Sequence, residues 1–185
     1  MPVTAAGVLL ALAATALAFA GLGMTGHMAA HMAAVAMAAP VIALAFPASR
    51  PARSPLLFAM IEFAIVWSFH LPALRHLADT SAAVALAEQA LFLAVGVALW
   101  RAALARPGEG VAALLLTSMH MTLLGALIAL APRPLYAMMA MHPAPGLDAL
   151  ADQQLGGVVM LIVGGASYCL GGLWMLGTLL RMRAA

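Results

Sequence analysis

Long apolar runs, separated by short polar or proline- and glycine-containing breaks, follow one another along almost the whole chain. A helix of about 20 residues can cross a hydrocarbon core of about 30 Å, and each run approaches that length. The pattern therefore predicts six membrane-spanning helices, over residues 3–22, 27–46, 54–71, 81–100, 111–131 and 153–180. We interpret the first run as a retained span rather than a cleaved signal peptide, because no basic residues precede it.

The composition explains why these runs cannot belong to a soluble domain. Hydrophobic residues make up 66% of the 185 residues and charged residues only 8%, against about 25% charged residues in an ordinary soluble domain. A soluble fold of this size cannot bury so much apolar surface. Residues 1–185 are therefore predicted to form a single domain, an all-α polytopic bundle in the lipid bilayer.

Charge and cysteine content exclude several classes of function. The net charge is +2 with no basic cluster, which excludes a nucleic-acid interface. The single cysteine, Cys169, excludes an internal disulfide and a multi-cysteine metal site.

The arginines are distributed unequally between the two sides of the predicted bundle. Arg75 and Arg133 fall on one side. The other six fall on the opposite side, at Arg50, Arg53, Arg101, Arg106, Arg181 and Arg183. Because arginine-rich loops stay in the cytoplasm, both termini are predicted to be cytoplasmic in a bacterial inner membrane. The segment 132–152 is then an outer loop, and its prolines predict an ordered, non-helical connection.

Histidines gather toward the outer ends of the predicted helices. His27 and His31 begin the second span, His70 ends the third, and His120 lies near the middle of the fifth. His27 and His31 are four residues apart, so their imidazoles lie over one another on one helix face. A pair with this spacing can bind one metal ion.

Methionines accompany these histidines. Met28 and Met32 directly follow the first two histidines. The pairing recurs in the outer loop, at Met138, Met139, Met141 and His142. Imidazole suits several metals whereas thioether sulfur selects Cu(I), so copper is the predicted cofactor and Met28 and Met32 its predicted entry path. The alternative is that the methionines fill the core and the histidines are hydrogen-bond partners between helices.

Two acids are expected inside the membrane, Glu62 in the third span and Glu88 in the fourth. Ionised acids there cost at least about 3 kcal/mol unless they are paired or hydrated. We therefore expect Glu88 to orient the histidines or to bind the metal directly. Asp152 is expected either to cap the start of the sixth span or to support the same site.

Proline and glycine positions predict local helix geometry. Pro40 lies near the inner end of the second span and should kink that helix, because its ring meets the preceding turn. Glycine pairs at 156/157, 164/165 and 171/172 predict close packing between helices.

Several motifs occur in the order found in a known family. They are His27-Met28 with His31-Met32 and Pro40, Trp67 with His70-Leu71-Pro72, Glu88 with Phe92 and Trp100, Gly125-Ala126 through Pro134-Leu135-Tyr136, and Asp152-Gln153-Gln154-Leu155-Gly156-Gly157 with Met160 and Gly164-Gly165. Over about residues 27–168 the chain therefore resembles a shortened member of the polytopic CtaG-like cytochrome c oxidase assembly factors. It departs from the family at Gln89, where a histidine tends to follow the acid.

The resemblance implies a non-enzymatic membrane factor that delivers copper, as Cu(I), to a heme-copper oxidase or helps to mature it. The expected partners are an oxidase subunit or a periplasmic copper carrier, with a homo-oligomer as a further alternative. The residues expected to hold or support the metal at the periplasmic side are His27, His31, His70, His120, Met28, Met32, Glu88 and Asp152. Three alternatives remain open: a b-type heme protein with two axial histidines, a metal transporter, and a metal-free structural subunit of an oxidase.

Overall fold

The computed structural model describes residues 2–47 and 53–184 as helices and the connections between them. The helical elements are α1 (Pro2–Ala18), α2 (Gly23–Met32), η1 (Ala33–Ala38), α3 (Ala39–Ala45), α4 (Pro55–Phe69), α5 (Pro72–Thr80), α6 (Ala82–Ala105), α7 (Pro107–Ala129), α8 (Ala137–Met141), α9 (Ala149–Val159), η2 (Met160–Gly164) and α10 (Gly165–Ala184). Arg50 and the side chain of Arg183, both used to predict the orientation, lie outside the described residues. The predicted all-α architecture is confirmed for the part of the chain that is described.

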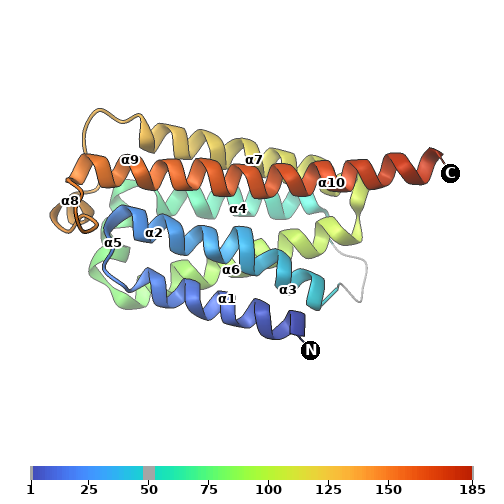
Figure 1. Cartoon of the computed structure of the whole chain (residues 1–185), viewed down its shortest axis with the longest axis horizontal. Helices are drawn as coiled ribbons and strands as arrows, with labels where there is room; N and C mark the ends of the chain where they lie inside the picture. The colour runs from blue at the N-terminus through green and yellow to red at the C-terminus, as the bar shows by residue number, and fades with distance from the viewer. Residues whose placement is uncertain (1, 48–52, 185) are drawn as a thin grey trace.

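The long helices run side by side along one axis of an elongated bundle (Figure 1). The chain enters and leaves the bundle at the same end, which we name the terminal end (Figure 1). The short helices α5 and α8 lie at the opposite end, together with the starts of α2 and α9 (Figure 1). We name this the α8 end.

Within the described residues, four helical stretches are long and apolar enough to span a membrane, namely Gly23–Ala45, Ala82–Ala105, Pro107–Ala129 and Ala149–Met182. A fifth candidate is the pair α4 and α5, which is bent by 73°. The bend follows from Leu71-Pro72, because the residue before a proline avoids the helical conformation, whereas proline itself suits a first helical position. α1 is apolar but shorter. The structure thus has four or five candidate spans, and a count of six stays a prediction.

The connection that follows α7 contains more helix than the sequence indicated. We predicted a non-helical segment over 132–152, but α8 lies within it and α9 already begins at Ala149. α9 starts early because the Asp148 carboxylate accepts hydrogen bonds from Leu150 N at 2.9 Å and Ala151 N at 2.8 Å. These contacts satisfy backbone donors that the first turn of a helix leaves free.

A π-helical segment precedes Pro40 in its helix, and the predicted kink stays a prediction. Proline has no N–H, so the carbonyl four residues earlier, at Ala36, loses its α-helical partner. The helix widens into the π-helical segment η1 before Pro40, and Ser167 Oγ donates to Ala36 O at 2.9 Å from α10. The distortion therefore also ties the second long helix to the last one.

The glycines pack helices together, as predicted. A Cβ on Gly157 of α9 would lie 2.7 Å from Gly125 O of α7 and 2.5 Å from Ala129 N. The two backbones are therefore too close for any larger residue at this position. Through this contact α9 is fixed against α7 near the α8 end.

Candidate metal centre

Three imidazoles converge near the α8 end of the bundle. His27 and His31 lie on one face of α2 with their rings edge to face, and the ring centroids are 3.9 Å apart. His70 comes from the end of α4, and its ring centroid lies 6.0 Å from that of His27 and 5.9 Å from that of His31. One ring nitrogen from each of the three lies within 4.8 Å of the others, and all three side chains are buried. We name these residues the histidine group.

The backbone around His70 fixes how its ring is presented. His70 directly follows α4 as its C-cap residue, before the bend, and its Nδ1 donates to Val66 O at 2.6 Å. The Tyr136 hydroxyl in turn donates to His70 O at 3.0 Å, and burial raises the pKa of Tyr136 to about 12, so this donor stays protonated. With Nδ1 carrying the hydrogen, Nε2 presents a lone pair, and it has no hydrogen-bond partner among the described residues. This is the tautomer that a metal-binding histidine uses.

Asp152 positions the helix that carries the other two histidines. Its carboxylate accepts hydrogen bonds from Met24 N at 2.7 Å and Thr25 N at 3.0 Å, and Thr25 Oγ1 donates to the Asp152 carbonyl at 3.1 Å. The expectation that Asp152 caps its own helix is therefore wrong, since Asp148 has that role. Asp152 instead caps α2 from α9, because the tight α7–α9 packing brings the first turn of α9 against the start of α2.

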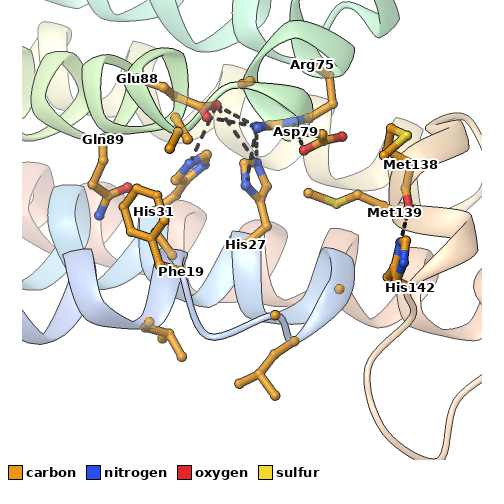
Figure 2. Close-up of a pocket in the computed structure, with 18 of the residues that line it drawn as sticks. Phe19, His27, His31, Arg75, Asp79, Glu88, Gln89, Met138, Met139 and His142 are labelled. Atoms are coloured by element: carbon orange, nitrogen blue, oxygen red, sulfur yellow. Dashed lines mark hydrogen bonds and ion pairs between the residues drawn. The ribbon is translucent and has the colours of Figure 1, made fainter.

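Glu88 and Arg75 bring opposite charges to the histidine group (Figure 2). Arg75 Nη1 donates to the two carboxylate oxygens of Glu88 at 2.7 and 2.9 Å, and its Nε donates to Asp79 Oδ1 at 2.9 Å. The same Nη1 lies 2.8 Å from His27 Nε2. Glu88 Oε1 lies 3.6 Å from His31 Nε2. Glu88 is therefore beside the histidines, as predicted, and its charge is paired.

Sequence reasoning assigned Arg75 to an outer loop and missed its place in the centre. The guanidinium is buried on α5, with 2% of the residue exposed. Two signals were present in the sequence. Arg75 is one of two arginines on the side that the positive-inside rule disfavours, and it precedes Asp79 by four residues, the spacing of a helical ion pair.

Three other predicted site residues lie elsewhere in the bundle. Among the described residues His120 is not part of the histidine group; its ring packs against Phe63 of α4 with centroids 5.3 Å apart. Met28 and Met32 belong to the buried hydrophobic core, with 0% and 3% of each residue exposed. α2 is oriented with His27 and His31 facing α4 and α6. In this orientation the next residues on the helix, Met28 and Met32, point into the interior of the bundle.

A cavity of about 350 Å³ adjoins the histidine group. His27, His31, Arg75 and Glu88 line it from α2, α5 and α6. Met138, Met139 and His142 line it from α8 and the residue that follows (Figure 2). Met28 and Met32, the predicted entry path, do not line this cavity; the methionines that border it, Met138 and Met139, belong to α8.

A family model matches most of this chain, including the residues of the centre. Residues 4–182 match the model of the cytochrome c oxidase caa3 assembly factor. The chain belongs to the caa3 assembly factor family. The resemblance that the sequence motifs suggested is thereby confirmed. Searches among curated proteins and among solved structures gave no match.

Two glutamines of this caa3 assembly factor stabilise the surroundings of the centre. Gln153, beside Asp152, accepts from Leu135 N at 2.6 Å and donates to Ile128 O at 3.3 Å, which holds the connection after α7. Gln89, next to Glu88, lines the cavity and donates to Ala30 O at 3.3 Å, between the two histidines of α2. Gln89 thus borders the centre and ties α6 to α2.

Proposed function

We propose that this protein is a non-enzymatic copper-binding assembly factor that passes Cu(I) to a cytochrome c oxidase during its maturation. The observation that carries the proposal is the convergence of His27, His31 and His70, whose ring nitrogens lie within 4.8 Å of one another. Membership of an oxidase assembly family supports a cytochrome c oxidase as the acceptor. Copper is the cargo here, and the histidine group is where it would be held.

The donor set fits a monovalent soft cation. Neutral imidazole is a good ligand for copper, and His31 Nδ1 and His70 Nε2 are buried without a hydrogen-bond partner among the described residues. Arg75, Asp79 and Glu88 carry formal charges of +1, −1 and −1, which sum to −1. One Cu(I) bound by neutral imidazoles would bring the sum to zero, whereas a divalent ion would leave a buried positive charge, which is costly in a membrane.

Arg75 makes the proposed site releasable. A guanidinium can only donate hydrogen bonds, so the contact of 2.8 Å from Arg75 Nη1 to His27 Nε2 occupies the lone pair that would bind copper. Binding through His27 therefore requires Arg75 to give up this contact while keeping Glu88 and Asp79. The competition weakens copper retention, which suits a protein that must hand its ion to an acceptor.

We assign the α8 end to the periplasm of a bacterial inner membrane. The end of α3, the start of α4 and the connection between α6 and α7 lie at the terminal end (Figure 1). Arg53 precedes α4 by two residues, and Arg106 lies between α6 and α7. The positive-inside rule then favours a cytoplasmic terminal end. A reporter that is active only in the periplasm should give a signal when it is fused near residue 142. A signal there from a reporter that is active only in the cytoplasm would contradict the assignment.

Matched histidine variants of the full chain in detergent test copper binding. His70→Ala removes a member of the histidine group, whereas His120→Ala removes a buried histidine outside it. We expect the first variant to lose most of the bound Cu(I), measured by metal analysis and chelator competition, and the second to retain it. Equal retention in both variants, with each folded, would contradict the proposal and favour a metal-free structural role.

The same preparations test the heme alternative. Purified protein with a Soret band that is lost in His70→Ala would favour a b-type heme protein over a copper carrier. In cells, His70→Ala should lower oxidase activity under copper limitation at an unchanged level of this protein in the membrane. Full oxidase activity in that variant would contradict copper delivery.

A further inference from the structure

Apolar residues such as Leu17 and Phe19 line part of the cavity beside the histidine group, and two other parts of its lining carry possible ligand atoms. One of these parts is formed by His27, His31, Arg75 and Glu88, all buried. The other part, which we name the α8 wall, consists of Met138 and Met139 of α8 and the following residue His142, which is exposed. Figure 2 shows these residues across the cavity from Arg75 and His27. An ion entering from the α8 end therefore meets the α8 wall before the buried histidines.

The α8 wall offers soft, neutral ligand atoms. Two thioethers come from the adjacent residues Met138 and Met139, and thioethers select Cu(I). His142 Nδ1 lies 3.3 Å from Met138 O. A carbonyl can only accept, so Nδ1 carries the hydrogen in this contact and Nε2 is left with a lone pair. The wall thus combines two sulfurs with one imidazole nitrogen.

An acidic atom lies on the same cavity between these two parts of its lining. Asp79 lines the cavity, and its Oδ1 accepts from Arg75 Nε at 2.9 Å. Its Oδ2 is buried and has no hydrogen-bond partner among the described residues. Such an oxygen lowers the electrostatic cost for a cation that passes the Arg75 guanidinium.

We propose that Met138, Met139 and His142 form a receiving subsite that takes up Cu(I) first and passes it to the histidine group. This inference rests on the proposed function, because the histidine group must itself accept copper. The subsite ligands are weaker and more exposed than the buried imidazoles, so they speed loading and contribute little to final retention. Oxidation state and total charge do not change in the transfer; thioether–copper contacts are exchanged for imidazole–copper contacts.

Loading kinetics of the full chain in detergent distinguish the subsite from the final site. The probe is the coloured Cu(I)–bicinchoninate complex, whose absorbance falls as the protein takes the ion. We expect Met138→Leu with Met139→Leu to slow loading by about fivefold or more while the amount of copper bound at equilibrium stays the same. Met→Leu preserves volume, so packing should be retained.

α8 itself provides the matched control. Met141 is on the same helix but is 62% exposed and does not line the cavity. Met141→Leu should load at the wild-type rate. If the double variant fails to fold, Met138→Leu alone is tested, because Met138 is not among the methionines that pack against the core.

The outcomes separate the two proposals. The receiving subsite is overturned if a folded Met138 variant takes up copper at the wild-type rate. It is also overturned if the variant loses copper bound at equilibrium as well as loading rate. Either result leaves copper binding by the histidine group standing. No copper uptake by the wild-type protein would overturn the proposed function and this inference with it.

X-ray absorption of copper held at the subsite, in a variant that lacks two histidines of the histidine group, identifies the ligands independently. In His31→Ala with His70→Ala, copper should remain at the subsite with sulfur in its coordination shell, as X-ray absorption detects. That sulfur signal should disappear when Met138→Leu and Met139→Leu are added. A signal without sulfur, or one that persists in the combined variant, would overturn the assignment of the methionines.

Discussion

Two buried acids of this bundle are held in very different ways. Glu88 is 2% exposed, and Arg75, His31 and the neighbouring cavity surround it. Glu62 is 0% exposed, and its carboxylate accepts a hydrogen bond of 2.5 Å from the Tyr168 hydroxyl. Burial of an acid in a membrane helix therefore does not by itself identify a site. A better indication of a candidate site is that several polar groups from different helices converge beside a cavity.

The two acids also differ in what they tie together. Glu62 joins α4 to α10 through a neutral phenol, and its other carboxylate oxygen has no partner among the described residues. Glu88 joins α6 to α5 through a charged guanidinium and lies beside α2. A charged network of this kind is costly to break at one member, because the partner charge is left buried.

The largest expected effect separates the two acids directly. Glu88→Gln should lower the free energy of unfolding by about 3 kcal/mol, because Arg75 keeps only Asp79 as a counter-charge. Glu62→Gln should cost about 1 kcal/mol or less, because an amide oxygen still accepts from Tyr168. Both can be measured by denaturant unfolding in mixed detergent micelles. Equal losses would show that charge pairing does not distinguish the two sites.

A smaller effect is expected from the two aspartates at the start of α9. Asp152→Ala should cost about 1 to 2 kcal/mol through loss of the α2 cap, and it should also weaken copper retention because His27 and His31 lie on that helix. Asp148→Ala removes the cap of α9 itself and should destabilise the protein without altering copper retention. Copper titration of both variants measures the difference. Identical retention in the two would mean that the α2 cap does not position the histidines.

The smallest expected effect concerns the Tyr136 hydroxyl behind His70. Tyr136→Phe should cost about 1 kcal/mol at neutral pH, since one hydrogen bond is lost. Burial raises the pKa of Tyr136 to about 12, above an unfolded value of about 10. The stabilisation is therefore complete below about pH 10 and is lost as the pH rises toward 12.

Unfolding of the wild type and Tyr136→Phe as a function of pH measures this contribution. The difference between the two proteins should be constant below about pH 10 and should shrink above it. A difference that grows with pH would show that the phenol is not the protonated donor to His70 O.

Local sequence signals determined the helices and part of the centre. Apolar runs, Pro40, Leu71-Pro72 and the four-residue spacing of His27 and His31 act within one or two turns, so their consequences can be derived without the fold. The family motifs also carried the assignment to oxidase assembly, which the family model confirms.

Tertiary packing decided which of the predicted residues meet. His120 carries the same side chain as His70, yet α7 presents it to Phe63, apart from the histidine group. Asp152 caps α2 and Arg75 enters the centre because α9 packs on α7 and α5 folds back by 73°. Sequence fixes the face on which each side chain lies, but the rotation and depth of each helix depend on contacts between residues far apart in the chain, and only the assembled bundle satisfies these contacts together.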